Sequence, residues 1–79
     1  MVKKTIKLIF PQHLIKQPVT YKTAIKYKVI PNIRRAKVTE TVGELVLELE
    51  GEQKNIDKAI KHFIKLGIDV EPIEGDLID

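Results

Sequence analysis

The stretch Val42-Gly43-Glu44-Leu45-Val46-Leu47-Glu48-Leu49-Glu50-Gly51 decides the fold. Its leucines recur at every second position, and glutamate or valine fills the positions between them. Because successive side chains of a strand point to opposite faces, this period of two predicts a half-buried strand over residues 44–50. The Val42-Gly43 pair predicts a tight turn before the strand, and Gly51 predicts its end.

The residues before this stretch predict two more strands and a helix. Residues 2–10 alternate between the two faces of a half-buried strand, which Pro11 stops. Pro18 suits the first turn of a helix that extends to about residue 29, and Pro31 would end it. β-branched residues and alternation then favour a strand over residues 33–41. Helical spacing predicts that one face of the helix carries Tyr21, Ala24, Ile25 and Val29.

The residues after the stretch predict a second helix and a last short strand. Apolar side chains recur at helical spacing over residues 52–66, and Gly67 stands where a left-handed C-cap belongs. Residues 68–73 favour a strand, and we expect the tail, residues 74–79, to be loose. The apolar stripe of this second helix consists of Ile56, Ala59, Ile60, Phe63 and Ile64.

The elements follow in the order β-α-β-β-α-β, which is the order of the ferredoxin-like α+β fold. This fold has a four-stranded antiparallel sheet in the spatial order 4-1-3-2, with both helices packed on one face. With 79 residues, the chain holds a single domain over residues 1–79, with its core at about 2–73. A domain of this size buries only about 60% of the surface of its unfolded chain, so we expect subunits to associate.

Positive and negative charges are separated along the chain. Residues 1–40 carry ten Lys or Arg and one acidic residue, a net of +9, whereas residues 41–79 carry four Lys and ten Asp or Glu, a net of −6. In the expected strand order, the glutamate-rich strand lies between the two basic strands. We therefore interpret the asymmetry as cross-strand pairing, such as Lys7 or Lys37 with Glu44 or Glu48, at about 0.2–1 kcal/mol per pair. A polyanion-binding patch is the alternative interpretation.

The composition excludes several kinds of site. The chain has no Cys and only two His, so we expect no metal and no cofactor. We interpret His13 as a solvated loop residue and His62 as a residue at the boundary of a helix, in preference to ligands or bases. The loop at residues 11–17 has no glycine to cradle a phosphate, and the open face of strand 44–50 has no aromatic side chain to stack nucleobases. We therefore expect a non-catalytic protein that binds no nucleic acid.

The sequence also lacks membrane-targeting signals. No apolar run approaches the roughly 18 residues that a membrane-spanning helix needs. The lysine-rich start lacks the continuous apolar stretch and the small-residue cleavage site of a signal peptide. We expect a cytoplasmic protein with no membrane insertion.

Several segments together resemble the NIL domain, a small ferredoxin-like module named for an Asn-Ile-Leu motif. The motif reads Asn32-Ile33-Arg34 here, and it is followed by the turn at Gly43, by the Leu45–Gly51 strand and exit, and by Leu66-Gly67-Ile68-Asp69-Val70-Glu71. The resemblance spans residues 30–73. The family is known as the C-terminal regulatory domain of methionine-import ABC transporter ATPases, and it also occurs attached to ferredoxin-like iron–sulfur domains.

The resemblance implies where a ligand would bind. In the transporter family the domain pairs with its twin, and methionine bound at or near the pairing interface inhibits transport. The Asn of the motif is implicated in that response, and Asn32 matches it. Arg34 replaces the usual Leu or Ile, which would change an apolar pocket for a thioether side chain. The candidate ligand-binding residues are Asn32, Ile33, Arg34 and Gly43.

Two side chains of the motif have more than one role open to them. The amide of Asn32 either braces the turn before the strand or donates to a ligand carboxylate. Alternation with Ala36 and Val38 turns Arg34 toward the helices. There it is either a structural ion pair or snorkelling cation, or a contact for the carboxylate of a ligand.

The leading hypothesis is a non-catalytic regulatory domain that senses a small molecule, an amino acid such as methionine, as a homodimer. The dimer would form through the strand at residues 33–41 or through the open sheet face, where Ile9 and Val46 are exposed among charges. The alternative is an interaction module without a ligand, which docks on an iron–sulfur or sulfur-transfer partner in sulfur amino-acid metabolism. An ABC transporter is the other expected partner.

Overall fold

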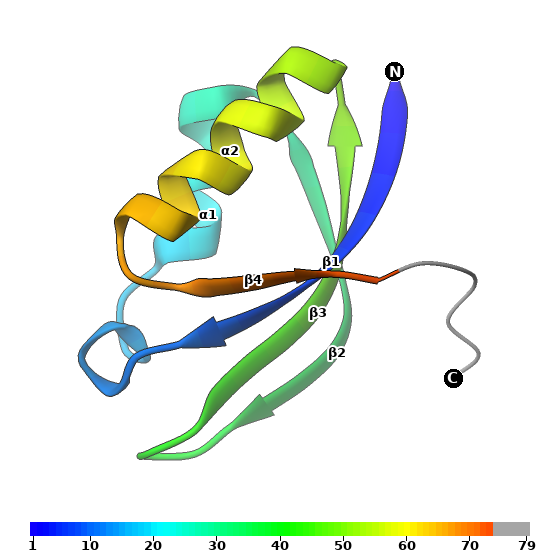
Figure 1. Ribbon diagram of the computed structural model, residues 1–79. Helices are drawn as coiled ribbons and strands as arrows, with labels where there is room; N and C mark the ends of the chain where they lie inside the picture. Colours follow the sequence, from blue (N-terminus) through cyan, green and yellow to red (C-terminus); the bar gives the residue numbers. More distant parts are fainter. Residues whose placement is uncertain (74–79) are drawn as a thin grey trace.

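The computed structural model describes residues 1–73, and the tail predicted to be loose, residues 74–79, lies outside them. Within residues 1–73 the elements follow the predicted order, with a short 3₁₀ helix added after the first strand (Figure 1). Their bounds are β1 (Val2–Phe10), η1 (Gln12–Leu14), α1 (Val19–Tyr27), β2 (Ile30–Val38), β3 (Gly43–Gly51), α2 (Gln53–Lys65) and β4 (Asp69–Pro72).

The four strands form one antiparallel sheet in the order β2-β3-β1-β4. Counted from the other edge this is 4-1-3-2, so the predicted ferredoxin-like α+β fold is confirmed. Both helices lie on the same side of the sheet (Figure 1). The sheet therefore has one covered face and one open face, and β2 and β4 are its two edges.

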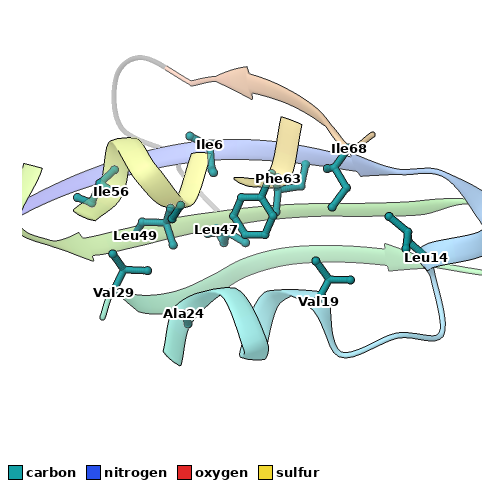
Figure 2. Packing of buried hydrophobic residues seen from close by; sticks show 12 residues of the cluster. Ile6, Leu14, Val19, Ala24, Val29, Leu47, Leu49, Ile56, Phe63 and Ile68 are labelled. Atoms are coloured by element: carbon teal, nitrogen blue, oxygen red, sulfur yellow. The ribbon is translucent and has the colours of Figure 1, made fainter. Parts of the chain in front are cut away.

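One hydrophobic cluster fills the space between the helices and the sheet (Figure 2). The alternation predicted for β1 and β3 is confirmed, because the inward side chains Ile6, Leu8, Leu47 and Leu49 are all buried. Each large apolar side chain taken out of water contributes about 1.5–3 kcal/mol. The predicted stripe of α2 is confirmed at its centre, although Ile64 at its border is exposed. The buried side chains of α2 are Ile56, Ala59 and Phe63.

Half of the buried face predicted for the first helix is confirmed. Ala24 and Val29 are buried as predicted, whereas Tyr21 and Ile25 are 67% and 59% exposed and Val19 and Thr23 are buried in their place. The prediction was wrong for Tyr21 and Ile25 because a helix of nine residues with apolar side chains on two sides offers two possible stripes. The true stripe contains a threonine, which a count of apolar residues leaves out.

β2 begins three residues earlier than predicted. The helix ends at Tyr27, because Lys28 adopts the left-handed conformation with φ 58° and ψ 48° and reverses the chain. Pro31, which we expected to end the helix, lies inside β2. An edge strand has neighbours on one side only, so it accommodates a residue without an N–H group.

The turn between β2 and β3 is formed by residues 39–42 rather than by a Val42-Gly43 reversal. The N–H of Thr39 donates to the carbonyl of Val42 at 2.7 Å. The hydroxyl oxygen of Thr39 accepts a hydrogen bond from the N–H of Val42 at 3.0 Å. A threonine side chain thus closes the loop, and Gly43 is already the first residue of β3.

A β-bulge interrupts β2. Ile33 pairs with Leu47, but the next pair is Arg35 with Val46, so Arg34 is an extra residue between them. Ile33 therefore shares the covered face with Leu47. The bulge interrupts the period of two at Arg34, so the direction predicted for its side chain stays a prediction. Arg34 itself is exposed.

The register brings opposite charges together across the sheet. Lys37 lies opposite Glu44, as predicted. Lys7 lies opposite Val46 of β3 and Glu71 of β4, so its acidic neighbour comes from the last strand instead of from Glu48. The basic strands of the first half of the chain and the acidic strands of the second half are therefore neighbours in the sheet.

Candidate functional site

An apolar cavity lies beside the edge strand β2. It has a volume of about 360 Å³ and is bounded by the start of α1, by β2 and by the first residues of β3. Its hydrocarbon walls come from Phe10, Ile15, Val19, Tyr21, Pro31, Ile33, Val38 and Leu45. A lining of this kind suits the apolar side chain of a small ligand.

Two residues of β2 form the outer wall of this cavity. Ile33 and Val38 are apolar, yet they are 56% and 60% exposed. They share the covered face of the sheet although they are five positions apart, because the bulge at Arg34 adds one residue between them. Exposed apolar side chains at the mouth of a cavity favour a ligand or a partner chain that would cover them.

Gly43 allows the cavity to close at its inner end. A Cβ atom at this position would lie 3.0 Å from Cγ1 of Ile15 and 3.2 Å from Cβ of Phe10. Only a residue without a side chain lets Ile15, which follows η1, pack this closely against β3. The role of Gly43 is therefore close packing at the cavity wall, in place of the turn that the sequence predicted.

The predicted ligand-binding residues fall into two groups. Ile33 and Gly43 line the cavity. Asn32 pairs with Glu48, between the inward-facing Leu47 and Leu49, so it belongs to the open face of the sheet. Arg34 is the bulge residue, and neither it nor Asn32 lines the cavity. Their contact with a ligand stays a prediction.

Few polar side chains face the cavity. Gln17 and Thr20 line it near the start of α1, and the phenol of Tyr21 belongs to the same helix. Glu44 is the one carboxylate among the lining residues, and it is opposite Lys37 in the sheet. Since Glu44 alternates with the inward-facing Leu45, its side chain belongs to the open face, so Gln17 and Thr20 are the polar partners for a ligand in the cavity.

Several lining residues were missed by sequence reasoning. Ile15, Tyr21 and Val38 come from three separate elements that only the fold brings together. The sequence contains one signal that was overlooked, because the adjacent Arg34 and Arg35 interrupt the alternation of β2. Two neighbouring polar residues inside an alternating strand are typical of a bulge.

Two other kinds of feature are absent from the described residues, a metal site and a membrane-spanning helix. Within residues 1–73, no three His, Asp or Glu side chains gather as they would around a metal ion. In the same part of the chain, neither helix has the length and apolar character needed to cross a membrane.

Comparison with known proteins identifies the family. A family model of the NIL domain matches residues 4–72, which include both helices and all of the sheet except the first two residues of β1. The chain belongs to the NIL domain family. A search of curated protein sequences returned no match.

The NIL domain is also similar to a solved structure. The C-terminal domain of an ABC transporter ATP-binding protein from Enterococcus faecalis is 30% identical in sequence and superposes with a TM-score of 0.81. The match covers 92% of this chain and 86% of that domain. The similarity therefore extends over nearly the whole of both domains.

Proposed function

We propose that this NIL domain is a non-catalytic, cytoplasmic regulatory domain that binds an amino acid with an apolar side chain, L-methionine first, as a homodimer. The observation that carries the proposal is the apolar cavity beside β2, lined by Ile33 of the family motif. Its volume of about 360 Å³ lies at the lower end of the range of small-ligand sites, about 300–1,000 Å³.

The lining matches the chemistry of such a ligand. The thioether chain of methionine would lie against Ile15, Ile33 and Val38, and burial of one such side chain contributes about 1.5–3 kcal/mol. The side-chain oxygens of Gln17 and Thr20, near the start of α1, would accept hydrogen bonds from the ligand ammonium group. Arg34, next to Ile33 at the bulge of β2, is the candidate to meet the ligand carboxylate, whereas Asn32, on the open face, is the candidate to brace the strand.

The position of the cavity supports a dimer. β2 is an edge strand of nine residues, and apart from Pro31 all of them are exposed. Pairing of β2 with the same strand of a second copy would continue the sheet and cover Ile33 and Val38. A ligand in the cavity would then contact the interface, so ligand binding and pairing would be linked. A transporter ATPase is the partner that the structural similarity supports.

The test is an amide-resolved NMR titration of the labelled protein with L-methionine. We expect saturable shifts at Tyr21, Ile33 and Gly43, similar shifts with L-norleucine, and none with glycine. Ile33→Ser should weaken binding roughly tenfold or more, because it removes an apolar wall. The matched control is Ile25→Ser, since Ile25 is equally exposed but lies outside the cavity.

The outcomes separate the parts of the proposal. Absence of shifts at millimolar methionine, or equal loss of affinity in the two variants, would contradict a ligand site in the cavity. Asn32→Ala tests whether that amide contacts the ligand. Sedimentation equilibrium with and without methionine tests the dimer, which the proposal expects to be stabilised by the ligand. A dimer whose stability is the same with and without methionine would instead favour the alternative hypothesis, an interaction module without a ligand that uses the exposed β2 edge to dock protein partners.

A further inference from the structure

The helix layer carries positive charge that the sheet does not neutralise. α1 contributes Lys22 and Lys26, and α2 contributes four more lysines. The one acidic residue within these two helices is Asp57, whose carboxylate accepts a hydrogen bond from Nε2 of Gln53 at 2.9 Å. Six lysines and one aspartate leave a net charge of +5 on the face opposite the open sheet.

Much of this charge lines one groove between the helices. The groove has a volume of about 410 Å³ and lies between the end of α1 and the carboxyl-terminal half of α2. Lys58, Lys61 and Lys65 recur at intervals of three and four, which places their ammonium groups along one side of α2. Lys26 faces them from α1, and none of the residues lining the groove is acidic.

Two aromatic rings line the groove. The hydroxyl of Tyr27 lies 3.4 Å from Nδ1 of His62, and the two ring centroids are 5.3 Å apart with the rings tilted by 53°. Both residues are half-buried. Nζ of Lys26 lies 5.4 Å from the centroid of the Tyr27 ring, within reach of a cation–π interaction. The two helices thus contact each other through these rings, which lie among the lysines that line the groove.

The electrostatics of His62 agree with a positive groove. Desolvation lowers the pKa of His62, and the positive charges of Lys26 and Lys65 lower it further. Lys58 and Lys61 line the same groove, and the other facing group is the neutral phenol of Tyr27. An anion bound here would oppose the lysines and raise the pKa of His62.

We propose that this groove, lined by Lys26, Lys58, Lys61 and Lys65, docks an acidic segment of a partner polypeptide. The positive charge of the groove attracts carboxylates. The lysine stems, together with Tyr27 and Leu66, supply an apolar surface between the ammonium groups. A peptide segment in which acidic and apolar residues alternate matches both parts of this lining, with its carboxylates at the ammonium groups and its apolar side chains on the surface between them. The site is separate from the cavity, which adjoins the opposite end of α1.

The experiment measures fluorescence anisotropy of a labelled peptide of alternating glutamate and leucine, with the glutamine and leucine peptide as the neutral control. We expect the acidic peptide alone to bind, with affinity that falls as salt rises from 50 mM to 500 mM. The triple variant Lys58→Gln, Lys61→Gln, Lys65→Gln should bind at least tenfold more weakly. The matched control is Lys3→Gln, Lys4→Gln, Lys16→Gln, which removes the same charge from exposed residues outside the groove and should change affinity less than twofold.

A second measurement reports on the groove directly. NMR titration of the His62 ring should show a higher pKa when the acidic peptide is bound to the wild type, and no such rise in the groove variant. Equal loss of affinity in the two triple variants would overturn the proposal, because binding would then follow net charge alone. Tighter binding of phosphatidylserine vesicles or of a single-stranded oligonucleotide, lost in the groove variant, would overturn it in favour of a phosphate-bearing partner.

Discussion

Thr23 is a buried polar residue that weakens the core. Its side chain is 1% exposed, and its hydroxyl has no hydrogen-bond partner among the described residues. Thr23→Val keeps the shape and removes the desolvated hydroxyl, so we expect the free energy of unfolding to rise by about 1 kcal/mol. Urea denaturation measures this change. Thr20→Val on the half-buried side of the same helix is the control, and an equal gain there would point to helix packing instead.

His62 gives the stability of the protein a pH dependence. Because folding lowers the pKa of His62, the unfolded chain binds the proton more readily than the folded one. The contribution of this residue is complete above the unperturbed pKa of about 6.5 and is lost as the pH falls through that value toward the lower folded pKa. Urea midpoints between pH 7.5 and 5.5 should therefore decrease, and His62→Gln should flatten the decrease. An unchanged slope in this variant would assign the effect to other groups.

The residues of the family motif were predictable in identity but not in orientation. Adjacent residues of a strand point to opposite faces, so the sequence already separates Asn32 from Ile33, but only the register with β3 shows that Ile33 is on the covered face. The place of Arg34 as the extra residue of a bulge was not predictable, because the bulge depends on how β2 pairs with β3. Local patterns therefore indicate which residues stand near a site, while pairing with distant strands decides which of them face it.

Both helices end in the same backbone arrangement, with different residues at the critical position. The N–H of Val29 donates to the carbonyl of Ala24, and the N–H of Ile68 donates to that of Phe63, each at 3.0 Å. The residue before the donor is left-handed in both cases, with φ 58° at Lys28 and φ 93° at Gly67. This is the Schellman type of C-cap, in which glycine is the unstrained choice.

Exchanging the residue types at the two caps should move stability in opposite directions. Lys28→Gly removes the strain of a left-handed side chain and should raise the free energy of unfolding by about 1 kcal/mol. Gly67→Ala should lower it by a similar amount through the backbone alone, because nothing lies within 4 Å of the added Cβ. Thermal denaturation followed by circular dichroism compares the two variants. A loss of stability in Lys28→Gly would show that the lysine side chain contributes more than its backbone strain costs.

The elements differed in how far their sequences determined them. β1, β3 and α2 were predicted closely, because each has a long and regular apolar period. The buried face of α1 is rotated relative to the predicted one, because the helix is short. β2 is displaced by three residues from its predicted bounds, because it lies at an edge of the sheet where little burial enforces alternation. The cavity lies between these two elements, so the least predictable part of the fold is also the part that forms the candidate site.

Residues 1–73 form a single core to which both helices and the central strands contribute. We therefore expect one cooperative unfolding transition, with far-ultraviolet circular dichroism and tyrosine fluorescence changing together. If the chain pairs as proposed, its thermal midpoint should rise with protein concentration, because association stabilises only the folded state. Melting curves at 5 μM and 500 μM measure this shift. Coincident curves at the two concentrations would contradict a dimer within that range.

The unequal edges of the sheet decide what kind of assembly strand pairing can build. β2 has nine residues, whereas β4, at the other edge, has four. Pairing of β2 with β2 uses the long edge of both copies at once, so growth stops at two. Pairing of β2 of one copy with β4 of the next would repeat from copy to copy and produce a filament. The four residues of β4 could pair with fewer than half of the nine residues of β2. The length difference thus favours a closed pair over open-ended polymerisation.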